Sequence, residues 1–191
     1  MKKITFLTGN AHKASEAAAI LAPLGYEVEL FAADLPEIQQ LSVEKIIEEK
    51  AKNARLFVPT DAVIIEDTGF FIDAYNEFPG ALGKFVLKGI GFPGILKLAD
   101  DSDKRARFKT VIAYLPEFED EVMYFKGEVT GRIVKPSAQP NPNMPFDAIF
   151  IPDGYESTFL ELGENVKNKI SHRTKALNAL AAYLKETEKT L

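Results

Sequence analysis

Apolar residues in the first third of the chain form short runs that alternate with helical stripes. Residues 4–7 make a short apolar run, and residues 17–24 carry apolar side chains three and four positions apart, as on one face of a helix. A second run follows at residues 28–30, and Ser42 can cap a long helix whose apolar stripe extends to Ala54. Residues 62–65 are apolar throughout, which is typical of a central parallel strand buried on both faces. The pattern predicts strand, helix, strand, helix, strand in a parallel sheet.

The middle of the chain changes to an alternating pattern. Residues 105–115 begin with charged side chains that alternate with apolar ones, and two further apolar runs follow after short turns, at residues 122–125 and 129–134. Short turns join antiparallel strands, because parallel strands need a longer crossover. We therefore expect antiparallel strands here, which either extend the first sheet or form a second sub-domain.

The last part of the chain predicts a loop, a strand and a terminal helix. Residues 135–145 hold four of the 11 prolines and must form a loop, after which residues 148–151 return as a strand. Apolar residues from Leu177 to Leu184 recur with helical spacing, and Ser171 is a natural cap for that helix. Since no repeat or flexible linker divides the 191 residues, we expect one α/β domain, 1–191, or two small lobes around a shared cleft.

The composition narrows the chemistry available to the chain. It has no cysteine and only two histidines, far apart in the sequence, so any metal is expected to be held by oxygen. A net charge of −5 argues against binding of nucleic acid, which requires a cationic surface. The apolar stretch near the first residue is too short for a signal segment or a membrane span. We expect a soluble, cytoplasmic protein with neither nucleic acid nor membrane as a partner.

The turn after the first strand is suited to phosphate binding. Thr8, Gly9 and Asn10 stand between strand and helix, where free backbone N–H groups and the helix dipole attract an anion. Gly9 permits close approach, and Lys13 adds a positive charge one turn into the helix. An ordinary Asn-capped turn with a solvated lysine explains this segment equally well, because short turns with glycine are common.

Two adjacent acids follow the third predicted strand. Glu66 and Asp67, with Thr68 behind them and Gly69 ending the strand, lie where open α/β sheets place their ligands. Two such carboxylates favour a hard divalent cation, although a pair of solvated turn acids is the simpler alternative. Successive side chains of a strand diverge, so we expect the two acids to have different roles. Glu37 follows the second strand and can reach the same edge, but taken alone it is typical of a surface loop.

A second group of polar residues lies near the end of the chain. Ser171, His172 and Arg173 stand at a helix start, where a hydroxyl, an imidazole and a guanidinium converge on unsatisfied N–H groups. Phe146 and Asp147, after the proline-rich loop, pair a flat apolar face with an acceptor, as a nucleobase site requires. A solvated basic cap and a packed loop anchor are the plain alternatives.

The order of these segments carries more information than any one of them. The chain closely resembles the inosine triphosphate pyrophosphatase family over about residues 4–184. The resemblance rests on the following motifs, in chain order: Thr8-Gly9-Asn10 with Lys13, Pro36-Glu37-Ile38-Gln39, Glu66-Asp67-Thr68-Gly69, Pro79-Gly80, Phe146-Asp147 and Ser171-His172-Arg173.

The resemblance implies an elongated α/β fold of two lobes, with a mixed sheet and the nucleotide in a central cleft. It also implies a homodimer that uses Mg²⁺ or Mn²⁺, and a metal site formed by Glu37 and Asp67 with the support of Glu66. Asp67 is then the catalytic proton acceptor. The remaining positions that match the family's substrate-binding residues are Thr8, Gly9, Asn10, Lys13, Lys50, Thr68, Lys84, Phe146, Asp147, Lys167, His172 and Arg173.

One segment departs from the family pattern. Many members have glycine, an aromatic residue, aspartate and proline before the late strand, whereas this chain has Pro145, Phe146, Asp147 and Ala148 after Met144. The aromatic residue and the acid are kept, but the flexibility of the glycine is lost. Because this loop frames the base, the departure bears on the preference for purines.

The activity that the resemblance implies is hydrolysis of ITP, dITP and XTP to the monophosphate and pyrophosphate. A first alternative is a related pyrophosphatase that removes modified pyrimidine or methylated nucleotides, with the same metal chemistry and a different base pocket. A second is a regulatory module that binds nucleotide without turnover. Three acids close to a polyanion argue against the second alternative, because a pure binder has little need for them.

Overall fold

The computed structural model describes residues 1–33, 35–100, 104–119 and 121–188. Within those residues, no helix is long and apolar enough to cross a membrane. The elements in chain order are β1 (Lys2–Leu7), α1 (Ala11–Leu21), η1 (Ala22–Leu24), β2 (Tyr26–Phe31), α2 (Val43–Ala54), β3 (Ala62–Ile72), β4 (Pro79–Gly80), α3 (Gly83–Asp100), β5 (Arg105–Leu115), β6 (Met123–Ile133), η2 (Pro145–Ala148), β7 (Phe150–Pro152), α4 (Phe159–Ile170) and α5 (His172–Glu188).

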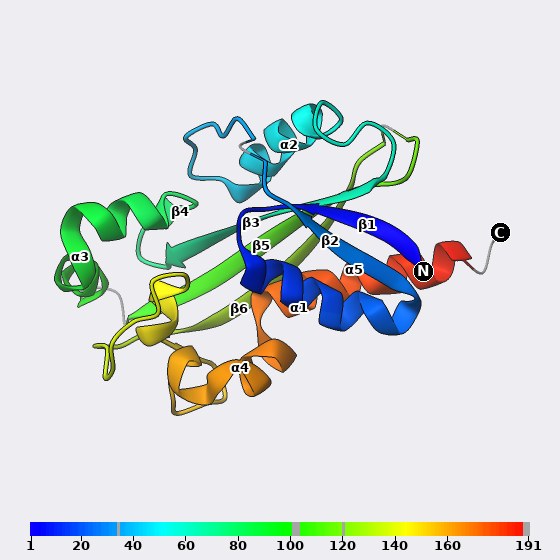
Figure 1. The fold of residues 1–191 in the computed structure, drawn as a ribbon. Helices are drawn as coiled ribbons and strands as arrows, with labels where there is room; N and C mark the ends of the chain where they lie inside the picture. Colours follow the sequence, from blue (N-terminus) through cyan, green and yellow to red (C-terminus); the bar gives the residue numbers. More distant parts are fainter. Residues whose placement is uncertain (34, 101–103, 120, 189–191) are drawn as a thin grey trace.

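One mixed sheet runs through the molecule in the order β2, β1, β3, β5, β6, β7, and the short β4 pairs with β3. β1 pairs with β2 and with β3 in the parallel sense, whereas β5, β6 and β7 join in the antiparallel sense. Figure 1 shows how β3, β5 and β6 extend well beyond the ends of β1 and β2. The predicted parallel beginning and antiparallel middle are both confirmed, and the second group extends the first sheet.

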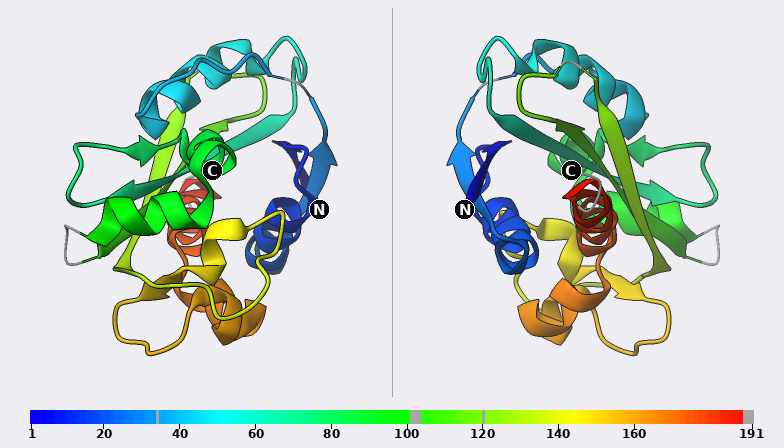
Figure 2. Two further views of the ribbon diagram at one scale, coloured as in Figure 1. Left: turned by 90° about the vertical axis from the view of Figure 1, so that its left-hand side faces the viewer. Right: turned by 90° about the vertical axis from the view of Figure 1, so that its right-hand side faces the viewer.

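Helices cover both faces of this sheet. α2 packs on one face, while α1 and α5 lie beside each other on the opposite face (Figure 1). The apolar stripes predicted for these three helices supply two of the three buried clusters. The third cluster lies at the far end of β3, β5 and β6, beneath α3 and α4, and is rich in phenylalanine. Figure 2 shows this far end and the opposite end of the molecule in turn.

Two predicted strand boundaries were wrong for the same reason. β3 continues through residues 66–69 to Ile72, so that Gly69 lies within the strand and does not end it. Residues 123–133 form the single strand β6, although Gly127 and Gly131 resemble turn residues. In each case the glycine sits under a neighbouring element and not in a turn: a Cβ on Gly69 would lie 2.8 Å from Val43 of α2. A third strand, predicted at residues 148–151, is shifted to β7 because residues 145–148 form a short 3₁₀ helix.

Helices α3 and α4 were not predicted, because each is bent at a glycine. Gly91 within α3 has φ 62°, and Gly163 within α4 has φ 72°, a backbone conformation that favours glycine. Each bend divides the helix into two short segments, so no apolar stripe with a constant period runs along it. The bend of α3 begins at Gly91, and Pro93 follows it within the helix.

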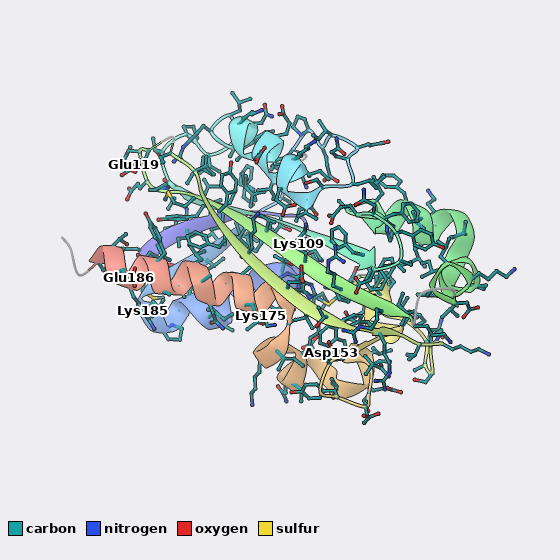
Figure 3. The ribbon with its side chains drawn as sticks, turned by 180° about the vertical axis from the view of Figure 1, so that it is seen from behind. Lys109, Glu119, Asp153, Lys175, Lys185 and Glu186 are labelled. Carbon is teal, nitrogen blue, oxygen red and sulfur yellow. The ribbon has the colours of Figure 1, made fainter. Side chains whose placement is uncertain are left out.

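The start of α5 packs closely against the glycine at position 127. A Cβ at Gly127 would lie 2.0 Å from the carbonyl oxygen of His172 and 2.6 Å from the amide nitrogen of Ala176. Figure 3 shows α5 lying along β5 and β6 from behind, with Lys175 at the close approach. The absence of a side chain at Gly127 therefore lets the first turn of α5 rest directly on the sheet.

We expect Gly127→Ala to lower the free energy of unfolding by about 1–3 kcal/mol, the usual cost of overpacking a well-filled interior. The same change should raise KM for the nucleotide, because His172 and Arg173 would shift with the helix start. Gly89→Ala, where an added Cβ meets nothing within 4 Å, is the matched control. Urea unfolding of the two variants checks the prediction, and equal stabilities would contradict it.

Candidate active site

The candidate site occupies a gap along one edge of β3. β1 pairs with β3 only over Ala62–Ile65, and β4 covers the same edge only at Phe70 and Phe71. Between them, among the described residues, the edge of β3 at residues 66–69 has no strand partner on that side. A cavity of about 710 Å³ opens there, within the size range of small-molecule sites.

The structure places every site residue predicted from the sequence in the wall of this one cavity. They come from six parts of the chain that are far apart in sequence: the turn after β1, the loop before α2, α2 itself, β3, the start of α3, and the segment from η2 to α5. The residues are Thr8, Gly9, Asn10, Lys13, Glu37, Lys50, Glu66, Asp67, Thr68, Lys84, Phe146, Asp147, Lys167, His172 and Arg173.

The two adjacent acids of β3 point to opposite faces of the sheet, as predicted from the pleat. Glu66 is buried on the face of α1 and α5, where it contacts Lys13, accepts a hydrogen bond from Thr68 at 2.5 Å and pairs with Arg173 at 3.3 Å. Burial alone would raise the pKa of Glu66, but the charges of Arg173 and Lys13 outweigh it and hold the pKa far below its usual value. Glu66 is therefore a permanent carboxylate that anchors two cations.

Asp67 lies on the face of α2 and shares a lysine with Glu37. The Nζ atom of Lys50 lies 2.6 Å from Oε2 of Glu37 and 3.5 Å from Oδ2 of Asp67. Burial raises the pKa of Asp67 above its usual value, although the charge of Lys50 opposes the shift. The pKa of Lys50 is raised as well, because Asp67 and Glu37 outweigh the effect of its burial. The carboxylates of Glu37 and Asp67 thus lie near the same ammonium group, although they come from different parts of the chain.

The predicted metal set of three acids is not gathered at one point. Within the described residues, no three side chains of the histidine, cysteine, aspartate and glutamate types lie close enough together to hold a metal ion. Glu66 is separated from Glu37 and Asp67 by the pleat of β3, and its oxygens are engaged by Lys13 and Arg173. Of the three acids, Glu37 and Asp67 are the two whose carboxylates lie near the same cation, the ammonium group of Lys50.

The turn after β1 forms an ordered start for α1. The side chain of Asn10 accepts hydrogen bonds from the amides of His12 at 3.0 Å and Lys13 at 3.4 Å, and the hydroxyl of Thr8 accepts one from the amide of Asn10 at 3.1 Å. The capping role considered for Asn10 is therefore present. The same turn also faces the cavity, so capping and anion binding are compatible at this position.

The opposite end of the cavity has aromatic rings in its wall, with a few polar side chains among them. The ring of Phe146 lies 4.7 Å from that of Phe70, and the imidazole of His172 stacks on Phe108 with centroids 4.6 Å apart. Asp147 pairs with Lys167 at 2.5 Å. An aromatic wall combined with buried donors and acceptors suits a nucleobase, which offers a flat face and a polar edge.

The polar groups at this end are held in defined charge states. Burial lowers the pKa of His172 well below its usual value, and the neighbouring charge of Arg173 lowers it further, so the imidazole is neutral. Its Nδ1 atom is buried and has no hydrogen-bond partner within the described structure. Burial raises the pKa of Asp147 against the charge of Lys167. A buried polar atom without a partner costs free energy until a ligand satisfies it.

One charged residue that contacts Arg173 from outside the cavity wall was not predicted from the sequence. Glu16 accepts a charge-assisted hydrogen bond from Arg173 at 2.7 Å and is itself largely buried. It lies three positions after Lys13, so that both side chains share one face of α1. That spacing was the available signal, but the partner, 157 residues away, could not be inferred from it.

Fold and cavity together define an α/β protein that can hold an anionic group beside acids and lysines at one end and an aromatic ring at the other. A sequence model of the Ham1 family matches residues 4–183, and the chain belongs to that family.

Relatives and solved structures agree with this assignment. The dITP/XTP pyrophosphatase of Methanopyrus kandleri is 43% identical over 186 residues, covering 96% of each chain. The dITP/XTP pyrophosphatase of Ignicoccus hospitalis is 39% identical over 184 residues, covering 96% of this chain and 97% of that one. The structure of the Staphylococcus aureus Ham1 protein superposes with a TM-score of 0.77 at 25% identity, covering 97% of this chain and 100% of that chain.

Proposed function

We propose that this chain hydrolyses dITP, XTP and ITP to the nucleoside monophosphate and pyrophosphate. The observation that carries the proposal is the convergence of all predicted site residues on one cavity, with Glu37, Lys50 and Asp67 at one end and the aromatic wall at the other. Relatives named dITP/XTP pyrophosphatase at 37–43% identity support the substrate class.

We further propose that Glu37 and Asp67 hold Mg²⁺, with Mn²⁺ as a substitute. Their oxygens already converge on a single cation, the ammonium group of Lys50, and Mg²⁺ characteristically uses one or two carboxylates together with water and substrate phosphates. The chain offers neither thiolate nor a histidine pair that would favour a softer metal. When bound, the ion supplies charge neutralisation and orientation of phosphate oxygens.

The side chains at the two ends of the cavity have different roles in the proposed reaction. Lys13, Lys50 and Lys84 line the cavity, and we assign to them the neutralisation of the negative charge that develops on the leaving pyrophosphate. Asp67 accepts a proton from the attacking water, a role for which a carboxylate in the wall of the cavity is suited. No covalent intermediate is required.

Base selection falls to the polar groups around the aromatic wall. Arg173 uses two of its nitrogens on Glu16 and Glu66, which fixes the plane of the guanidinium and leaves N–H donors over for a ligand. A 6-keto purine presents an acceptor to such donors, whereas adenine presents an amino group and leaves them unpaired, at a cost of about 1–3 kcal/mol for each buried group. ATP is thereby disfavoured.

Pyrophosphate release from a substrate panel tests the proposal. With Mg²⁺ present we expect ITP, dITP and XTP to be cleaved at least about tenfold more efficiently than ATP, the discrimination expected from one mismatched polar group. Removal of the metal with a chelator should abolish cleavage, and Mn²⁺ should restore it. Preferential cleavage of dUTP or of a methylated nucleotide would contradict the purine assignment, and cleavage that survives chelation would contradict the metal assignment.

The family resemblance also underlies the proposal that the enzyme is a homodimer in the cytoplasm. Light scattering of the purified protein distinguishes a mass twice 21.2 kDa from that of the single chain.

A further inference from the structure

One methionine stands at the base end of the cavity beside a buried ion pair. Met144 directly precedes η2, is half-buried and lines the cavity wall. Its Sδ atom lies 2.8 Å from Nζ of Lys167, and the same nitrogen lies 2.5 Å from Oδ2 of Asp147. Lys167 is only 4% exposed, and its ammonium group also lies 5.9 Å from the ring centroid of Phe159. Among the described residues, the thioether is one of two hydrogen-bond acceptors of this buried cation.

Oxidation would change the character of this contact. A thioether sulfur is a weak acceptor, whereas a sulfoxide is polar and carries an oxygen that accepts strong hydrogen bonds. A sulfoxide oxygen on Met144 would compete with Asp147 for Lys167 and would place a new polar group against the aromatic wall. Both effects alter the surface that receives the base and leave the acids of β3 untouched.

We propose that Met144 is a site of reversible oxidation by hydroperoxides, and that the sulfoxide weakens nucleotide binding by drawing Lys167 away from Asp147. The inference rests on the proposed function and adds a mode of regulation to it. The sulfur lone pair attacks the terminal oxygen of the hydroperoxide ROOH, the O–O bond breaks, an S–O bond forms, and the other oxygen leaves as ROH, or as water when R is hydrogen, after gaining the proton. Sulfur is oxidised by two electrons and the peroxide is reduced by two. In the reverse reaction two thiols of a sulfoxide reductase system reduce the sulfoxide to the thioether, the oxygen leaves as water and the thiols form a disulfide.

The effect of oxidation at Met144 can be distinguished from the effect of oxidation elsewhere in the chain. The sequence has three methionines and no cysteine, so peroxide has few competing targets. Met1 is 81% exposed at the start of the chain, and Met123 packs at the edge of the cluster beneath α5. Neither residue lines the cavity. Oxidation at those two positions therefore serves as an internal reference within the same sample.

The expected effect is on binding more than on turnover. Lys167 and Asp147 belong to the base end of the cavity, whereas Asp67 and Lys50 belong to the phosphate end. We expect oxidation of Met144 to raise KM for ITP about tenfold, the size associated with one lost buried hydrogen bond. The change in kcat should be smaller. A general loss of structure would instead lower kcat by reducing the fraction of folded enzyme.

The test treats the whole protein with hydrogen peroxide and measures sulfoxide at each methionine by peptide mass spectrometry. Activity on ITP should fall in step with oxidation of Met144, and methionine sulfoxide reductases of both stereospecificities should restore it. Met144→Leu should keep its own untreated activity after peroxide, whereas Met123→Leu should lose activity as the wild type does. Met144→Gln, which introduces a polar acceptor without oxidation, should raise KM in untreated enzyme.

Two results would overturn this inference alone: complete oxidation of Met144 with unchanged KM, or a Met144→Leu enzyme as sensitive to peroxide as the wild type. Thermal melts show whether each variant folds, and the peroxide series on the wild type decides the matter without any variant. An untreated enzyme that leaves ITP intact would overturn the proposed function, and this inference with it.

Discussion

Asp67→Asn is expected to lower kcat for ITP hydrolysis by about 10²- to 10⁴-fold, the usual contribution of a positioned general base. The amide cannot accept the proton of the attacking water, and it is a poorer ligand for a divalent cation than a carboxylate. The fold should persist, because Lys50 keeps its 2.6 Å contact with Glu37 after the charge at position 67 is removed. Nucleotide binding, measured by calorimetry, should remain detectable.

A matched control for this change lies just before the same strand. Asp61 precedes β3 and its side chain is 43% exposed, outside the cavity wall. Asp61→Asn should therefore leave kcat unchanged. Wild-type turnover by Asp67→Asn would refute the catalytic assignment, whereas loss of turnover by both variants would point to an effect on the strand as a whole.

The second large effect concerns stability. Glu66→Gln should lower the free energy of unfolding by about 3–5 kcal/mol, because it leaves Arg173 and Lys13 without their shared buried partner. Arg173 retains Glu16, which limits the loss but does not cancel it. Glu29→Gln, which removes one half of an exposed pair with Lys3, should change stability little and is the control.

The pH dependence of unfolding separates this charge effect from simple loss of packing. The pKa of Glu66 is lower in the folded chain than its ordinary value of 4.5, so its contribution is fully present above that value. The contribution is lost progressively as pH falls below 4.5 toward the folded-state pKa. The stability difference between wild type and Glu66→Gln should therefore shrink in acid. A difference that stays constant from neutral pH to pH about 3 would refute the charge-based account.

Much of the architecture could be read from periodicity, and the exceptions share a physical cause. The apolar stripes of α1, α2 and α5 and the order of the first three strands are local patterns, and the structure confirms them. Gly69 was predicted to end a strand, and a turn was predicted between residues 125 and 129, because a glycine that admits a packed helix cannot be told from a turn glycine in sequence. The bends at Gly91 and Gly163 hid α3 and α4 in the same way.

The sequence predicted which residues belong to the site better than it predicted which of them contact one another. The divergence of Glu66 and Asp67 follows from the pleat of a strand and is confirmed. What periodicity could not provide was the pairing between distant segments. The contact of Glu16 with Arg173 depends on how α1 packs against α5, and that of Met144 with Lys167 on how the segment before η2 packs against α4, and neither follows from spacing in the sequence.

We propose that Glu37 and Asp67 hold a divalent cation against the phosphates of the nucleotide, and the rest of the proposed mechanism depends on this site. Titration of Mn²⁺ into the protein with the non-hydrolysable α,β-imido analogue of ITP, followed by electron paramagnetic resonance, tests it most directly. We expect tight Mn²⁺ binding that requires the analogue and that is lost in both Asp67→Asn and Glu37→Gln. Unchanged Mn²⁺ binding in both variants would contradict it.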